Sequence, residues 1–349
     1  MTAIIGATHV LCAIGSGTEQ VWASARAGIA RIGSSYVMDR NFEAIQMGLV
    51  PEPALAPLVP KIEELPLPSR ARRMLRLAAP SFKAVAGNVP GPVPVFLGLP
   101  ELSQDEAPWL KHVPGYLQLM TGIEVDRERS VVVPGGRAAA LIALERALGV
   151  LEAGDVHEVV VGGIDTYLDL RLLATLDGEK RILGRTVMDG FIPGEGAAFY
   201  VLRGAEETGK EGGPQVSVRG ASSTQDPGHR YGDAPAKGEG LALALEQLRQ
   251  RIGAPPGPIA TTFAGFNGEN FDAKLWGVAR LRHNDLFAPN MVMEHPADKY
   301  GDAGAATGAI MVALAAQALT TGTRSGPALV WAASDREPRA CAVLSSSTA

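Results

Sequence analysis

A short turn, Pro134–Leu141, joins a predicted strand to a predicted helix, so a helix N-terminus lies at this turn. A helix N-terminus carries partial positive charge, so it stabilises an anionic nucleophile such as a thiolate. The segment between Val131 and Gly154 nevertheless contains no cysteine, serine or threonine. Arg137 stands in the turn instead. The sequence therefore predicts a helix N-terminus that lacks a nucleophilic side chain.

The positive charge of Arg137 is unfavourable at a helix N-terminus, because the helix dipole is also positive there. An arginine is also costly to bury unless a carboxylate pairs with it. We therefore predict an ion pair between Arg137 and a carboxylate. Asp302 is the first candidate, and Glu195 and Glu269 are the alternatives.

Each of these residues also has a purely structural interpretation. Asp302 fits the N-cap of a helix, Arg137 could face solvent if the turn is reshaped, and Glu195 between two glycines fits a pinned tight turn. Asn267, followed by glycine, is first of all a turn signal. The predicted pocket consists of Gly136, Arg137, Glu195, Asn267, Glu269 and Asp302.

The composition excludes several function classes. The chain has 349 residues, of which 46% are hydrophobic, and a formal net charge of −5, so a generic basic nucleic-acid surface is not supported. Its six histidines are scattered without ligand spacing, which predicts neither a metal nor a cofactor. No apolar run favours a membrane span. Cys12 and Cys341 form no disulfide framework and are expected in the core, which suggests a cytoplasmic protein.

Two stretches of the chain repeat the same order of predicted elements. Residues 134–202 and 300–344 each run from a turn through a helix of small residues to an apolar strand and a final strand. We therefore predict an α/β fold with two similar halves, residues 1–204 and 215–349, joined by a linker at 205–214. The first half contains a strand-turn-helix unit over 130–154, with a strand Ser130–Val133 and a helix Arg137–Glu152.

Three segments resemble the β-ketoacyl synthase branch of the thiolase superfamily. The strongest is Asp189–Ala198 (DGFIPGEGAA), followed by Val201-Leu202. Leu141–Leu144 resembles the run after that family's nucleophile, and Gly301–Gly308 resembles its G-H-T segment. The resemblance implies a five-layered αβαβα fold, a tight dimer and Claisen condensation of acyl thioesters. It also implies a machinery of one cysteine and two histidines.

This chain departs from the family pattern at each catalytic position. The cysteine position falls on Arg137, or on Gly136 if the turn slips by one, and Asp302 replaces one histidine. The loop at 263–270, where the other histidine would lie, has none, and a non-glycine segment at 332–338 replaces the family's gating loop. We therefore predict no catalytic residue and interpret the chain as a ketosynthase-like pseudoenzyme.

Such a protein would act by association, as a homodimer or as a heterodimer with a related subunit. An acyl carrier protein is one expected partner, and the basic run Ser69–Arg73 is either its docking site or a solvated helix face. Similarity to uncharacterised bacterial ketosynthase-like proteins suggests a type VI secretion effector as another. The alternatives are an acyltransferase with Glu195, Glu269 or His295 as general base, and a module that binds an acyl thioester without turnover.

Overall fold

The computed structural model describes residues 2–102, 107–204, 215–253 and 257–346. Ten of its strands follow one hydrogen-bonded order, β11-β10-β12-β13-β9-β1-β8-β7-β5-β6, with the short β2 (Gly15–Ser16) beside β1. Strands β1 and β9 pair at only two positions, Ala3 with Val218 and Ile4 with Ser217, and so join two five-stranded sheets. The predicted linker at 205–214 lies outside the described residues.

The two sheets have the same topology. In the first sheet β6, β5 and β7 are paired in parallel, and the pairs β7-β8 and β8-β1 are antiparallel. In the second sheet β11, β10 and β12 are likewise paired in parallel, and the pairs β12-β13 and β13-β9 are antiparallel. The first sheet contains β1 (Ala3–Cys12), β5 (Val93–Leu99), β6 (Val125–Pro134), β7 (Glu158–Thr166) and β8 (Glu195–Gly204). The second contains β9 (Val216–Gln225), β10 (Ile259–Ala264), β11 (Phe287–Glu294), β12 (Ala328–Ala333) and β13 (Pro338–Ser346).

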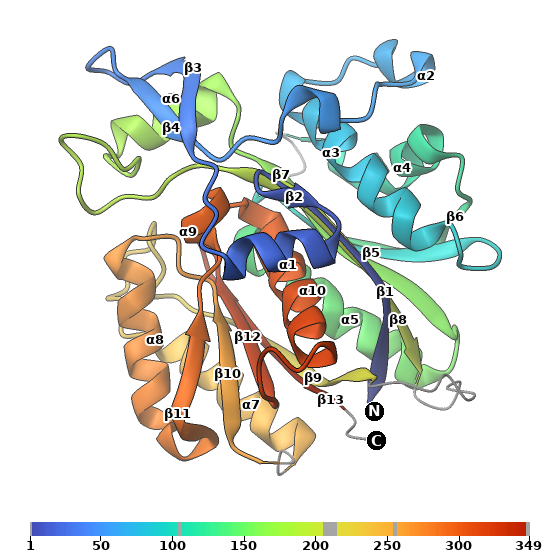
Figure 1. Cartoon of the computed structure of the whole chain (residues 1–349), viewed down its shortest axis with the longest axis vertical. Helices are drawn as coiled ribbons and strands as arrows, with labels where there is room; N and C mark the ends of the chain where they lie inside the picture. Colours follow the sequence, from blue (N-terminus) through green and yellow to red (C-terminus); the bar gives the residue numbers. More distant parts are fainter. Residues whose placement is uncertain (1, 103–106, 205–214, 254–256, 347–349) are drawn as a thin grey trace.

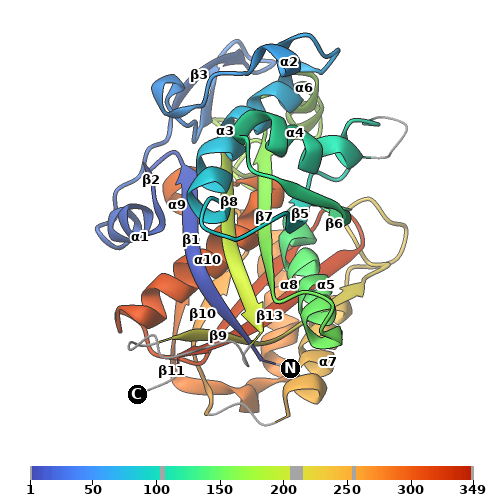
Figure 2. The same cartoon turned by 90° about the vertical axis from the view of Figure 1, so that its right-hand side faces the viewer.

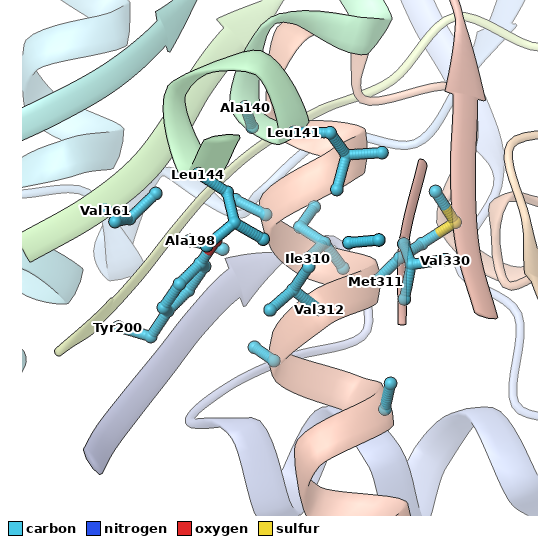
Figure 3. Close-up of a cluster of buried hydrophobic side chains, with 14 of the residues drawn as sticks. Ala140, Leu141, Leu144, Val161, Ala198, Tyr200, Ile310, Met311, Val312 and Val330 are labelled. Atoms are coloured by element: carbon cyan, nitrogen blue, oxygen red, sulfur yellow. The ribbon is translucent and has the colours of Figure 1, made fainter. Parts of the chain in front are cut away.

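Two helices, α5 (Ala139–Ala153) and α10 (Thr307–Thr320), fill the space between the sheets. Their small residues allow close packing, and Figure 3 shows side chains of both helices meeting those of β7, β8 and β12. The outer layers are α3 (Ser69–Ala86) with α4 (Val113–Thr121) on the first sheet, and α7 (Glu239–Ile252) with α8 (Asn270–Arg282) on the second (Figures 1 and 2). The predicted five-layered αβαβα fold built from two similar halves is therefore confirmed.

The remaining elements lie at the edges of these layers. Helix α1 (Thr18–Arg26) lies beside α10 in Figure 1. A small cap, which we define as β3 (Gly33–Met38), β4 (Ala44–Met47), α6 (Leu170–Gly178) and the segment 179–194, has its own apolar cluster. Short helical pieces occupy Glu52–Ala54, Pro60–Glu63, Leu110–His112, Gly136–Ala138, Asn284–Leu286, Ala297–Tyr300 and Gly304–Ala306.

Several local predictions were wrong in detail. The strand expected over Ser130–Val133 is the longer β6, and the helix expected from Arg137 begins two residues later, after a 3-10 turn. Elements α6, α8, β3, β4 and β11 were not predicted at all. Strand β11 contains Pro289 and Asn290 in a mixed pattern, so its sequence lacks the continuous apolar run of a buried strand.

Gly98 lets α5 begin directly on the first sheet. A Cβ atom there would lie 2.4 Å from the amide nitrogen of Ala140 and 2.7 Å from its Cα. We expect Gly98→Ala to lower the free energy of unfolding by about 2–4 kcal/mol, because helix backbone must move. Gly149→Ala is the control: it lies on α5 with no atom near its added methyl group and should change stability by about 1 kcal/mol or less, in the stabilising direction. Equal urea midpoints for the two variants would contradict this account of the layer spacing.

Candidate functional site

The turn at the head of α5 is held from the second half of the chain. Strand β6 ends at Pro134, Gly136 adopts a φ of 62°, and the 3-10 turn Gly136–Ala138 leads into α5. Ser334, after β12, donates its hydroxyl to the carbonyl oxygen of Gly135 and accepts the amide of Ala138 at 3.0 Å. The segment at 332–338 therefore fixes the conformation of the turn.

Arg137 points into the protein and is 4% exposed. Its Nη1 lies 3.1 Å from Asp272 Oδ2 and 3.3 Å from Asp302 Oδ2, and its Nη2 lies 3.2 Å from Asp335 Oδ1. The predicted pair of Arg137 with Asp302 is thus confirmed, and the solvent-facing alternative is wrong. Asp272 and Asp335 were missed, because they lie 135 and 198 residues away in sequence and no local spacing links them to the turn.

Asp302 takes the pairing role proposed for it but not the N-cap role, because the N-cap residues of the short turn and of α10 are Ala303 and Ala306 and neither has a side-chain cap. One carboxylate oxygen accepts the amide of Gly304, two residues further on, at 2.8 Å. The other accepts from Arg137 and, at 3.2 Å, from Asn267 Nδ2. Arg137, Asp302 and the loop at 263–270, which the resemblance aligns with the cysteine and the two histidines, are therefore brought together.

A second arginine closes the outer side of this site. Arg181 binds Glu269 through Nε at 2.9 Å and Nη2 at 2.8 Å, and it binds both carboxylate oxygens of Asp335 at 2.8 and 2.9 Å. Arg230 Nη2 lies 3.0 Å from Glu269 Oε1, and Asn267 donates to Glu269 at 2.9 Å. We call this group the charged cluster: Arg137, Arg181, Arg230, Asn267, Glu269, Asp272, Asp302 and Asp335.

The cluster shifts the ionisation of its members in opposite directions. Burial would raise the pKa of Asp335, but Arg137 and Arg181 outweigh it and lower that pKa to about 2. Burial raises the pKa of Asp272 to about 6, against the attraction of Arg137, whose Nη1 lies 3.1 Å from Asp272 Oδ2. Burial would lower the pKa of Arg137, but its aspartates raise it well above its ordinary value. Arg137 is therefore charged throughout the physiological range.

Asp272→Asn should change how stability depends on pH. The folded pKa of Asp272, about 6, lies above its ordinary value of 3.8. The folded protein therefore binds this proton more tightly than the unfolded chain does. As pH rises from about 4 to about 6, the contribution of Asp272 to the free energy of unfolding falls by up to about 3 kcal/mol. Urea unfolding of both proteins between those pH values should show the variant's stability rising relative to wild type. Parallel curves would contradict the assignment.

Glu195 belongs to a different buried cluster. It is 0% exposed and accepts from Arg73 at 2.6 Å on both oxygens, from Thr166 Oγ1 at 2.7 Å and from the amide of Val50 at 2.8 Å. The structure thus gives Glu195 the structural role and places it outside the Arg137 pocket. This corrects its inclusion in the pocket.

The basic run Ser69–Arg73 is neither a solvated face nor a free docking face. Arg70 binds Asp165 Oδ1 at 2.8 Å, Arg73 binds Glu195, and Arg72 donates to three backbone carbonyls. These guanidinium groups are engaged within the chain, so both sequence interpretations of this run are wrong.

Other candidate residues also lie apart from the turn. His295 is half exposed and faces Asp298, and Cys12 and Cys341 are buried free thiols, as expected. Glu101, not predicted, lies with its Cβ 3.5 Å from the Cβ position of Gly136. Burial, with Asp335 as a further cause, raises the pKa of Glu101 to about 7.

The described residues contain no group of three or more histidine, cysteine, aspartate or glutamate side chains placed to hold a metal ion. Within the same ranges, no helix combines the length and apolarity needed to cross a bilayer.

No protein-family model matches the sequence. Among solved structures, the chain resembles the ketosynthase from module 6 of the bacillaene synthase of Bacillus subtilis 168, with a TM-score of 0.79 and 12% identity over 100% of this chain and 72% of that one. The thiolase-like fold of this chain is that of the ketosynthases. The chain also resembles the Xenorhabdus doucetiae ketosynthase ApeO in complex with its chain length factor ApeC. The TM-score is 0.73, with 15% identity over 99% of this chain and 98% of that one.

A third similar structure is AntDE:AntF, an acyl-carrier protein of a type II PKS in complex with its ketosynthase. Its TM-score is 0.77, with 14% identity over 98% of each chain. At these identities the likeness establishes the fold and leaves the activity to be argued from the site.

Proposed function

We propose that this chain is a non-condensing ketosynthase-like subunit that acts by association with another protein. The observation that carries this proposal is the buried guanidinium of Arg137, held by three aspartates at the head of α5. Covalent acyl transfer needs an activated nucleophile at this place. A permanently protonated guanidinium has no lone pair to offer, so it cannot take an acyl group.

The neighbours of Arg137 support the same conclusion. Asp302 and Asn267, at or near the positions that the resemblance gives to histidines, are bonded to each other and hold the cluster together. Enolate chemistry requires stabilised negative charge on the substrate, and four carboxylates around the turn disfavour it. The charged cluster therefore holds the two halves of the chain together.

The three bases named for the acyltransferase alternative, Glu195, Glu269 and His295, are each engaged elsewhere. Glu195 and Glu269 each accept two hydrogen bonds from one arginine, so both oxygens of each carboxylate are occupied. His295 is exposed and faces Asp298. The acyl-binding alternative is disfavoured by the side chains of Ser334 and Glu101, which lie 3.3 and 3.5 Å from the Cβ position of Gly136.

Association through β6 is the second part of the proposal. Strand β6 is the outer strand of the first sheet and, in the ranges described, pairs only with β5. An open strand edge is a template for pairing with another chain. The similar structures include ketosynthases complexed with a chain length factor or a carrier protein. We propose that β6 pairs with β6 of a second copy or with a related subunit.

The two halves supply a matched test of this interface. Val132 lies on β6, and Val292 lies on β11, the equivalent outer strand of the second sheet. Val132→Lys should raise the dissociation constant of the dimer, or of the heterodimer, at least about tenfold, since an edge lysine blocks strand pairing. Val292→Lys should leave it unchanged in analytical ultracentrifugation. Equal effects, or none, would contradict association through β6.

The compartment and the partner complete the proposal. Two buried free thiols fit a reducing cytoplasm. An acyl carrier protein is one proposed partner, in keeping with the similar ketosynthase that is complexed with its carrier protein, and a bacterial secretion effector, suggested by the sequence resemblance, is the other.

A further inference from the structure

A pocket of about 370 Å³ lies between α4 and β6, at the margin of the first sheet. Strand β6 contributes Arg127, Ser130 and Val132 to its lining, and α4 with the short helical piece Leu110–His112 forms the opposite wall. Figures 1 and 2 show α4 beside β6, the outermost strand of this sheet. No residue of the neighbouring strand β5 lines the pocket, which therefore opens at the edge of the sheet.

The lining of this pocket is positively charged. Lys111, His112 and Arg127 line it, and its described lining residues include no carboxylate. Gly115 has no side chain, so the guanidinium of Arg127 lies against the backbone of α4, with its Cζ 3.0 Å from the position that a Cβ atom would take at Gly115. Within the residues described, neither Lys111 nor Arg127 forms an ion pair. The pocket therefore offers two unmatched cations to an anionic group.

A carboxylate without a counter-charge lies on the same strand. Asp126, near the start of β6, is engaged: it accepts the amides of Glu128 and Arg129 at 3.1 Å each and pairs with the Arg129 guanidinium at 2.9 Å. Glu128 is exposed and forms no ion pair in the part of the chain that is described. One strand edge thus carries an unmatched carboxylate and, beside it, a pocket with unmatched cations.

Two-fold pairing of β6 with β6 of a second copy brings these opposite charges together. In an antiparallel pair around an axis at Ser130, Glu128 of the second copy stands opposite Val132, since each is two residues from the axis. Side chains that are directly opposite point to the same face, with Cβ atoms about 4.5–5.5 Å apart. Val132 lines the pocket, so the carboxylate reaches it. A two-fold interface makes this contact twice.

We propose that the pocket between α4 and β6 receives Glu128 of a second copy of this chain. Lys111 and Arg127 bind its carboxylate, so the charges of this edge favour a homodimer over pairing with another subunit. This inference rests on the proposed function, because it assumes association through β6, and it names the partner and the side chains that recognise it.

Reversing the charge on either side of this contact tests the proposal. Glu128→Lys, and separately the double variant Lys111→Glu with Arg127→Glu, should each raise the dissociation constant of the dimer at least about tenfold in analytical ultracentrifugation, because both symmetric contacts become repulsive. An equimolar mixture of the two proteins should dimerise with a dissociation constant within about threefold of wild type. In the mixed dimer each pocket again meets a side chain of opposite charge.

Two variants with the same changes of charge serve as matched controls. Glu19→Lys on α1 and Lys274→Glu on α8 alter exposed residues on elements other than α4 and β6, and they should leave the dissociation constant unchanged. Lys111, Arg127 and Glu128 are themselves exposed, so the urea midpoints of their variants should match that of wild type.

Three results would overturn the proposal: a wild-type chain that stays monomeric at about 100 µM, charge reversals that leave the dimer unchanged, or a mixture that dimerises no better than either variant alone. If Val132→Lys weakens the dimer while the charge reversals do not, association through β6 stands and only this inference fails. The non-condensing character of the chain is judged separately, from acyl transfer to the protein itself.

Discussion

Arg137→Met should lower the free energy of unfolding by about 3–5 kcal/mol, because it leaves buried carboxylates without their cation. Asp272 depends most on Arg137, since its other oxygen has no hydrogen-bond partner among the described residues. Asp335 keeps Arg181, and Asp302 keeps the amide of Gly304. The loss should therefore come mainly from Asp272 and Asp302. Urea unfolding at pH 7 measures it.

Two controls separate this effect from lost packing. Arg137→Met with Asp272→Asn removes one stranded charge and should recover part of the loss, so the two changes are non-additive. Arg185→Met removes an arginine from an exposed pair with Glu43 and should change stability by about 0.5 kcal/mol or less. A single variant Arg137→Met as stable as wild type would refute the ion-pair account of the turn.

Arg73→Met should cost about 3–5 kcal/mol, because Glu195 is wholly buried and would be left with only Thr166 and the Val50 amide. Glu195→Gln alone leaves Arg73 with its weaker partners, the Val50 carbonyl and Glu52, and should cost less. The double variant should be more stable than Arg73→Met. A double-mutant cycle with additive losses would show that the pair does not couple, contrary to its geometry.

The fold was largely predictable because its signals are local. A glycine turn followed by small and apolar residues marks α5, and the repeat of that order predicts α10 and the second half. Helix α8 was missed because charged and apolar residues alternate along it without a clear apolar stripe. Because α8 was not predicted, Asp272, which lies in the first turn of α8, was not recognised as a partner of Arg137 either.

The site was only partly predictable. That a buried Arg137 needs a carboxylate follows from desolvation alone, and Asp302 follows from the pseudo-symmetry of the two turns. Glu195 and Glu269 were reasonable alternatives, but each is bound to an arginine other than Arg137. Arg181 and Asp335 lie in irregular segments brought together only by the tertiary fold, so no spacing in the sequence identifies them.

Exposure of the purified chain to acyl-carrier-protein thioesters, followed by intact-protein mass spectrometry, tests the central claim most directly. Acetyl, octanoyl and malonyl thioesters should leave the mass of the protein unchanged and release no carbon dioxide, while a cysteine-containing ketosynthase in parallel should be acylated. A stoichiometric acyl adduct on this chain, or a condensed product, would show that the site beside Arg137 still transfers acyl groups and would contradict the account.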